Sequence, residues 1–151
     1  MEKHIGYIEN GINIDHIPQG NAWYIIKILK LDKSSSQVGI GLNLPSKKFG
    51  KKDLIKIENH SISQNEIDSI STFCMGSTLS VIKDFKVIEK KTLELPKKIN
   101  NIIICPNIRC VSRLYNSQFN SSINHNHKIY VKCYYCEQSF LLNELSEYKL
   151  D

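Results

Sequence analysis

Cys105-Pro-Asn-Ile-Arg-Cys110 and Cys133-Tyr-Tyr-Cys136 are the two stretches that decide the fold of the last third of this chain. They form the pattern C-x4-C, a 22-residue gap and C-x2-C, and the only other cysteine is Cys74. Two short cysteine turns separated by a loop bring four thiolates to the corners of a tetrahedron, the coordination that Zn²⁺ favours. Because four thiolates leave no open coordination position, Cys105, Cys110, Cys133 and Cys136 predict one structural zinc ion per chain, not a catalytic one.

Two disulfide bonds in a secreted protein are the alternative explanation of the four cysteines. That explanation requires an export signal, and Met1-Glu-Lys-His-Ile-Gly6 has no basic stretch followed by an apolar run. A cytosolic chain with such spacing more often binds metal. We therefore expect a zinc site and a cytoplasmic location.

The composition limits the possible partners of the chain. A hydrophobic fraction of 41% is enough for globular cores, and no stretch approaches the ~18 apolar residues of a membrane span. The net charge of +5 favours nucleic acid, but only two of the 20 basic residues, Arg109 and Arg113, are arginines. Because arginine is the favoured residue for bidentate contacts to bases and phosphates, its scarcity weakens this interpretation. A nucleic-acid-binding zinc-ribbon protein stays as the alternative.

Residues 5–90 change hydrophobic periodicity several times. Ala22, Ile25, Ile26 and Leu29 have helical spacing, and Ser63 with Glu66 matches a capping box at the start of a second helix. Alternating apolar residues predict strands on either side of both helices. The expected elements are a strand within 5–14, a helix at 22–31, strands at 38–44 and 53–57, the helix after Ser63, and strands at 79–82 and 85–88. The first six of these elements follow the order β-α-β-β-α-β, which predicts a ferredoxin-like sandwich, an antiparallel sheet with two helices.

The C-terminal segment has a different pattern. Residues 90–98 contain Pro96 and predict a linker, and residues 101–104 predict a strand that leads into Cys105. Residues 116–127 are rich in Ser and Asn and predict a loop, followed by a strand at 128–132 and an apolar stretch at 140–142. A segment of about fifty residues usually needs a metal for stability. The fold class is therefore α+β, with a sandwich at 1–96 and a small, mostly β zinc-binding domain at 97–151.

Several longer motifs resemble the regulatory chain of aspartate carbamoyltransferase. They are Asn13-Ile-Asp-His-Ile-Pro18, Gly39-Ile-Gly-Leu-Asn-Leu-Pro45, Lys52-Asp-Leu-Ile-Lys-Ile-Glu-Asn59, Cys105-Pro-Asn107 and Cys133-x-x-Cys136-Glu137. The resemblance implies a non-catalytic subunit whose N-terminal domain binds nucleoside triphosphates and forms homodimers. It also implies a zinc domain that docks on the catalytic chain of the pyrimidine pathway, in a complex of two catalytic trimers and three regulatory dimers. CTP or UTP would inhibit this complex and ATP would activate it.

The residues that the family uses for nucleotides also have simpler explanations. Lys56 lies between Ile55 and Ile57, so its side chain points away from theirs, as on any solvated sheet face. Asp15 suits a cap at a helix entry, and Lys90 suits a linker. By resemblance, however, the nucleotide-binding residues are Ile8, Asp15, His16, Lys56, Ser80, Ile82, Phe85, Val87 and Lys90. Two ammonium groups and an imidazole suit the charge of a triphosphate, about −4, because charge-assisted hydrogen bonds are about twice as strong as neutral ones.

The resemblance places Asn107, Arg109 and Glu137 at the interface with the catalytic chain. Two residues depart from the family: Ser80 and Arg109 each stand where the family has an amide side chain. No catalytic residue set is visible, because the chain has no Gly-rich phosphate loop and a closed zinc site activates no water.

Overall fold

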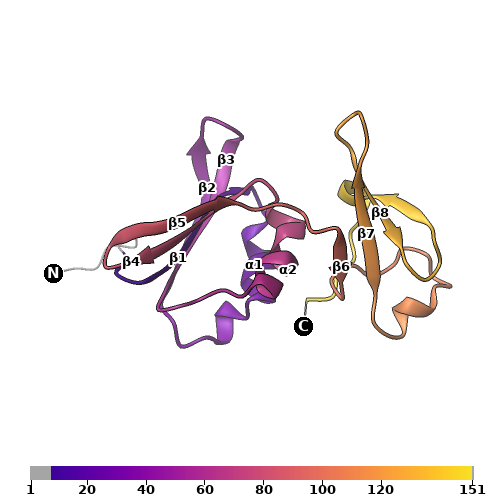
Figure 1. Ribbon diagram of the computed structural model, residues 1–151, viewed down its shortest axis with the longest axis horizontal. Helices are drawn as coiled ribbons and strands as arrows, with labels where there is room; N and C mark the ends of the chain where they lie inside the picture. The colour runs from indigo at the N-terminus through magenta and orange to yellow at the C-terminus, as the bar shows by residue number, and fades with distance from the viewer. Residues whose placement is uncertain (1–7, 151) are drawn as a thin grey trace. The chain divides into compact units, whose positions relative to one another are not determined.

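Five strands of the N-terminal unit form one antiparallel sheet in the order β2-β3-β1-β4-β5 (Figure 1). The computed structural model describes residues 8–150 and divides into two units, Met1–Glu94 and Leu95–Asp151. The strands are β1 (Gly11–Pro18), β2 (Val38–Ser46), β3 (Gly50–Glu58), β4 (Thr78–Lys83) and β5 (Lys86–Thr92). The helices are α1 (Ala22–Ile28) and α2 (Gln64–Cys74). The order β2-β3-β1-β4 is the ferredoxin-like order that the sequence predicted, and β5 extends the sheet beyond β4.

One face of this sheet is covered by both helices, and neither helix covers the other face. Alternate residues of the three central strands are 0–1% exposed and pack with α1 and α2 in a single core; they are Ile12, Ile14, Ile55, Ile57 and Leu79. Full burial of each such side chain contributes about 1.5–3 kcal/mol. Because side chains alternate along a strand, the residues between them point to the opposite face. We call that opposite face the open face.

A capping box at Ser63 determines where α2 begins. Ser63 Oγ accepts a hydrogen bond from the Glu66 N–H at 3.2 Å, and Glu66 Oε1 accepts one from the Ser63 N–H at 3.1 Å, so the predicted capping box is confirmed. Cys74, at the end of the helix, is fully buried in the core. Burial raises the pKa of its thiol to about 12 against a smaller opposing effect of Ser77, so Cys74 is an inert core residue.

A buried carboxylate ties α1 to the sheet. Asp53 is 0% exposed, and its oxygens accept hydrogen bonds from the backbone N–H groups of Gly20, Ala22 and Asn43 at 2.9, 3.3 and 3.2 Å. We expect Asp53→Ala to lower the free energy of unfolding of the N-terminal unit by about 3–5 kcal/mol, because the three backbone N–H groups lose the carboxylate that accepts their hydrogen bonds. Chemical denaturation measures this loss. Asp32→Ala is the control, since Asp32 is exposed and forms a surface ion pair with Lys27. An equal loss in both variants would contradict the role of Asp53.

A second antiparallel sheet, in the order β6-β7-β8-β9, forms the C-terminal unit. Its strands are β6 (Lys98–Asn100), β7 (Gln118–Ile123), β8 (Ile129–Cys133) and β9 (Ser139–Leu141). The buried apolar residues are few: Ile99, Ile102, Ile103, Phe119 and Val131. The predicted α+β fold class is confirmed.

Several predicted boundaries are wrong. The helix expected at 22–31 ends at Ile28, because Lys30 adopts a left-handed conformation (φ 54°). The linker expected at 90–98 is shorter, because β5 continues to Thr92 and β6 begins at Lys98. The strand expected at 101–104 lies three residues earlier, at β6. The loop expected at 116–127 contains the strand β7, which pairs with β8. Most residues of β7 are polar, and Phe119 is its one buried residue. In the first strand, residues 5–7 lie outside the described residues, and β1 begins at Gly11.

Candidate metal centre and open face

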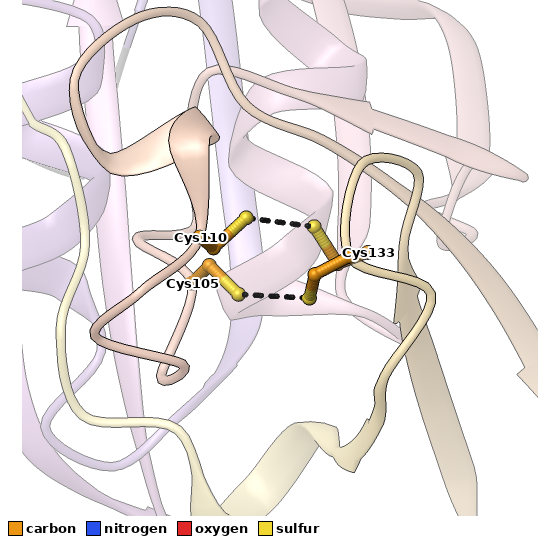
Figure 2. Close-up of side chains that lie close together, drawn as sticks. Cys105, Cys110 and Cys133 are labelled. Atoms are coloured by element: carbon orange, nitrogen blue, oxygen red, sulfur yellow. Dashed lines mark hydrogen bonds between the residues drawn. The ribbon is translucent and has the colours of Figure 1, made fainter.

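The four predicted zinc ligands come together in the C-terminal unit. Their sulfur atoms all lie within 4.8 Å of one another. Cys105 Sγ lies 3.7 Å from Cys136 Sγ, so the first cysteine turn, or knuckle (residues 105–110), contacts the second knuckle (residues 133–136). Cys110 Sγ likewise lies 3.7 Å from Cys133 Sγ, and Figure 2 shows these two side chains pointing toward each other. Four sulfurs bound to one Zn²⁺ at about 2.3 Å are about 3.8 Å apart, whereas a disulfide needs about 2.05 Å. The geometry therefore fits a tetrahedral metal site and excludes disulfide pairing in this conformation.

Hydrogen-bond donors surround these sulfurs. Burial works to raise the pKa of Cys110, but the Ser112 hydroxyl and backbone N–H and the neighbouring thiols of Cys133 and Cys105 lower it to about 7. The Ser112 hydroxyl, 3.0 Å from Cys110 Sγ, is itself buried. Burial raises the pKa of the Cys105 and Cys133 thiols. Of Cys105, Cys110 and Cys133, only Cys110 has a lowered pKa, and a bound zinc ion would hold all four sulfurs as thiolates.

Arg113, in the turn after Cys110, contacts the first knuckle. The Arg113 side chain donates a hydrogen bond to the Cys105 carbonyl and lies 3.6 Å from the Glu147 carboxylate. In the second knuckle, Glu137 adopts a left-handed conformation (φ 62°) and its N–H donates to the Cys133 carbonyl at 2.9 Å. Both cysteine turns thus have hydrogen bonds in addition to the contacts between their sulfur atoms.

Most of the predicted nucleotide-binding residues share the open face of the N-terminal sheet. Directly opposed residues of antiparallel strands point to the same face. The strand register pairs Lys56 with Asn13, Asn13 with Ser80, and Ser80 with Lys90, so one row crosses β3, β1, β4 and β5. We call these four residues the polar row. Ile82 and its partner Val87 lie on one side of the row.

Asp15 lies on the other side of the polar row, where a β-bulge between Ile14 and Ile17 disturbs the pairing of β1. The bulge contains His16, whose backbone adopts a positive φ of 59° and whose Nδ1 lies 3.9 Å from Asp15 Oδ2. Bulges of this kind re-aim side chains at the edge of a site.

The remaining predicted residues differ in exposure. Ile8 is buried in the core, whereas Phe85 is 62% exposed at the turn between β4 and β5.

Two residues of the open face were missed from the sequence. Lys52 Nζ lies 2.8 Å from Asp15 Oδ1, and Asn13 occupies the centre of the polar row. Lys52 lies four residues before Lys56 on the same strand, so its period-two spacing was a usable signal. Asn13 lies two residues before Asp15, so the same spacing was available for it, but only the strand register places it between Lys56 and Ser80.

The knuckle turns also carry exposed apolar residues. The predicted interface residues Asn107, Arg109 and Glu137 all lie on these turns, where Asn107 Oδ1 accepts a hydrogen bond from the Arg109 N–H at 3.1 Å. Beside them, four large side chains are exposed: Ile108, Val111, Leu114 and Tyr115. We call these four residues the knuckle surface. Exposed apolar residues gathered in this way are typical of a protein-binding surface.

Comparison with known proteins identifies the family. Residues 3–94 match the family model described as the aspartate carbamoyltransferase regulatory chain, allosteric domain, and residues 97–146 match the metal binding domain of the same chain. The chain belongs to the aspartate carbamoyltransferase regulatory chain family. The prediction of a regulatory, non-catalytic subunit with a structural metal is thereby confirmed.

Curated regulatory chains from several bacteria are similar over most of their length. The chain is 45% identical to the one from Photobacterium profundum over 136 residues, which covers 88% of this chain and 87% of that one. It is 38% identical to the one from Vibrio cholerae over 143 residues, 93% and 91% of the two chains. It is 36% identical to the one from Shigella dysenteriae over 138 residues, 90% of each. Among residues 8–150, no helix is long and apolar enough to cross a membrane.

In this regulatory chain, the ion pair of Asp15 predicts a pH effect. Burial tends to raise the pKa of Asp15, but the hydrogen bond from Lys52, with further effects of His16, holds it below its ordinary value of 3.8. The pair therefore adds stability above pH 3.8 that is lost as the pH falls through the native pKa. We expect Lys52→Met to raise the pKa of Asp15, as measured by NMR titration of its carboxyl carbon. The control, Lys51→Met, removes an exposed neighbouring charge, and an Asp15 pKa that stays unchanged in Lys52→Met would contradict the pairing.

Proposed function

We propose that this chain binds nucleoside triphosphates on the open face and docks on an aspartate carbamoyltransferase catalytic chain through its zinc unit. The polar row supports the first part, because it places Lys56 and Lys90 on one face, with the apolar pair Ile82 and Val87 beside them. Lysine ammonium groups suit phosphate oxygens, and apolar side chains suit a sugar and base. CTP or UTP would lower the activity of the complex and ATP would raise it, in control of pyrimidine synthesis in the cytoplasm.

The knuckle surface supports docking. It is apolar, lies on turns held by the metal site, and adjoins Asn107, Arg109 and Glu137. The catalytic chain is the partner we propose for it, in keeping with the family to which this chain belongs. Arg109 and Asn107 would supply polar contacts at the rim of an apolar contact, the usual anatomy of such interfaces.

The outer strand β2 supports a homodimer through the N-terminal unit. Within the described residues it pairs only with β3, and it exposes Ile40 and Leu42. An unpaired edge with apolar side chains is a template for pairing with a second chain. Three such dimers would bridge two catalytic trimers. Both units match the regulatory chain, which disfavours the alternative of a nucleic-acid-binding zinc ribbon.

Calorimetric titration of the purified chain with CTP and with ATP tests the open face. We expect each nucleotide to bind at one site per chain and to displace the other, because one row of cations serves both triphosphates. Simultaneous binding of CTP and ATP, or binding of neither, would contradict a shared site on this face.

A further inference from the structure

We propose that Asn13 recognises a hydrogen-bond donor on the sugar or base of the nucleotide and so helps to set nucleotide preference. This inference rests on the proposed function. Asn13 Oδ1 is shut off from solvent and has no hydrogen-bond partner among the described residues. Its strand neighbours, Lys56 and Ser80, are residues already predicted to contact nucleotide.

The position of Asn13 suits contact with the middle of an extended ligand. Neighbouring strands lie about 4.8 Å apart, so the polar row from β3 to β5 spans about 14 Å. Asn13 and Ser80 lie at its centre, between Lys56 and Lys90. A nucleotide that contacts both Lys56 and Lys90 would therefore pass over the Asn13 side chain.

The chemistry of an amide oxygen restricts what that contact can be. The Asn13 oxygen only accepts hydrogen bonds, and the oxygens of an ionised triphosphate also only accept. The donor must then be a ribose hydroxyl or an N–H group of the base. CTP and ATP present a base amino group and ribose hydroxyls, whereas UTP has a carbonyl in place of the cytosine amino group and its only base donor is the ring N3–H.

The energetics favour a ligand contact over a purely structural role. A buried acceptor without a donor costs about 1–3 kcal/mol, and nothing in the described part of the chain offsets this cost at Asn13. The Asn13 side chain as a whole is only partly buried. Because the last torsion of asparagine is broad, its amide can turn toward the open face while the backbone of β1 keeps its pairing.

The test compares nucleotides that differ by one donor. Affinities of CTP, UTP and 2′-deoxy-CTP are measured by calorimetry for the natural chain and for Asn13→Val, a residue that suits a strand. We expect the natural chain to lose about five- to tenfold in affinity with one of the two analogues, the size of one hydrogen bond. Weak UTP identifies the base amino group as the donor, and weak 2′-deoxy-CTP identifies the ribose hydroxyl.

In Asn13→Val, CTP should bind about five- to tenfold more weakly than to the natural chain. The difference in affinity between CTP and the analogue that the natural chain binds weakly should disappear. Without nucleotide, the variant should melt at the same or a higher temperature, because an unpaired buried acceptor has been removed. Thr78→Val is the matched control. It makes a polar-to-apolar change of similar shape on β4, beside Asp15 on the same face, and it should keep the discrimination.

Each contrary outcome overturns a separate statement. If the natural chain binds no nucleotide, the proposed function fails and this inference fails with it. If nucleotides bind but Asn13→Val discriminates as the natural chain does, or the natural chain binds all three equally, this inference alone is wrong.

Discussion

Removal of the metal is expected to unfold residues 97–151 while the N-terminal unit keeps its secondary structure. The C-terminal unit buries few apolar side chains around Phe119, and a unit of its size is marginal on its core alone. Its four thiols come from two segments that only the fold brings together. Binding of a structural zinc ion to such sites supplies about 10–16 kcal/mol, and this becomes folding free energy.

Elemental analysis and amide hydrogen exchange of Cys133→Ala measure this effect. We expect less than one zinc ion per chain and loss of protection throughout β7 and β8, with protection retained in β1 and β3. Cys74→Ala is the matched control, since Cys74 lies in the other core and should leave the zinc content at one ion per chain. A folded natural chain that contains no stoichiometric metal would contradict the account.

Replacement of Lys56 or Lys90 is expected to weaken nucleotide binding by about 1.5–3 kcal/mol each, roughly 10- to 150-fold, if each ammonium group contacts a phosphate. The loss should shrink at high salt, because partly exposed charges are screened. Calorimetry with CTP and ATP measures it in Lys56→Ala and Lys90→Ala.

Lys91→Ala is the control for these variants. Lys91 is the neighbour of Lys90, but it pairs with Leu79 on the face that the helices cover, so its removal should leave affinity nearly unchanged. Equal losses in Lys90→Ala and Lys91→Ala would show that general charge, and not the polar row, attracts the nucleotide.

Short-range signals in the sequence were enough to predict most of the framework. The Ser63–Glu66 capping box and the spacing of the four cysteines each act over a few residues, and both appear in the structure as expected. The strand β7 was missed because most of its residues are polar, and its pairing with β8 is a long-range property. The early end of α1 was missed because Lys30, not glycine, adopts the left-handed conformation there.

The candidate nucleotide site could be predicted only in part, because strand pairing is a long-range property. Local motifs indicated Asp15 and Lys56, but they do not show which strands are neighbours in the sheet. Only the register joins Lys56, Asn13, Ser80 and Lys90 in one row. Asn13, whose buried oxygen has no hydrogen-bond partner within residues 8–150, therefore becomes a candidate only once the sheet is known.

The central claim is that nucleotides on this chain control a catalytic partner. A nucleotide shifts such a complex only if it binds one of two global states better than the other. The direct measurement is aspartate saturation of a catalytic trimer assembled with this chain, with and without CTP or ATP. We expect no turnover by this chain alone, and in the complex opposite shifts of apparent aspartate affinity within the usual coupling range of about 1–3 kcal/mol, or 5- to 150-fold. A stable complex whose aspartate saturation ignores both nucleotides would contradict the claim and leave this chain as a scaffold.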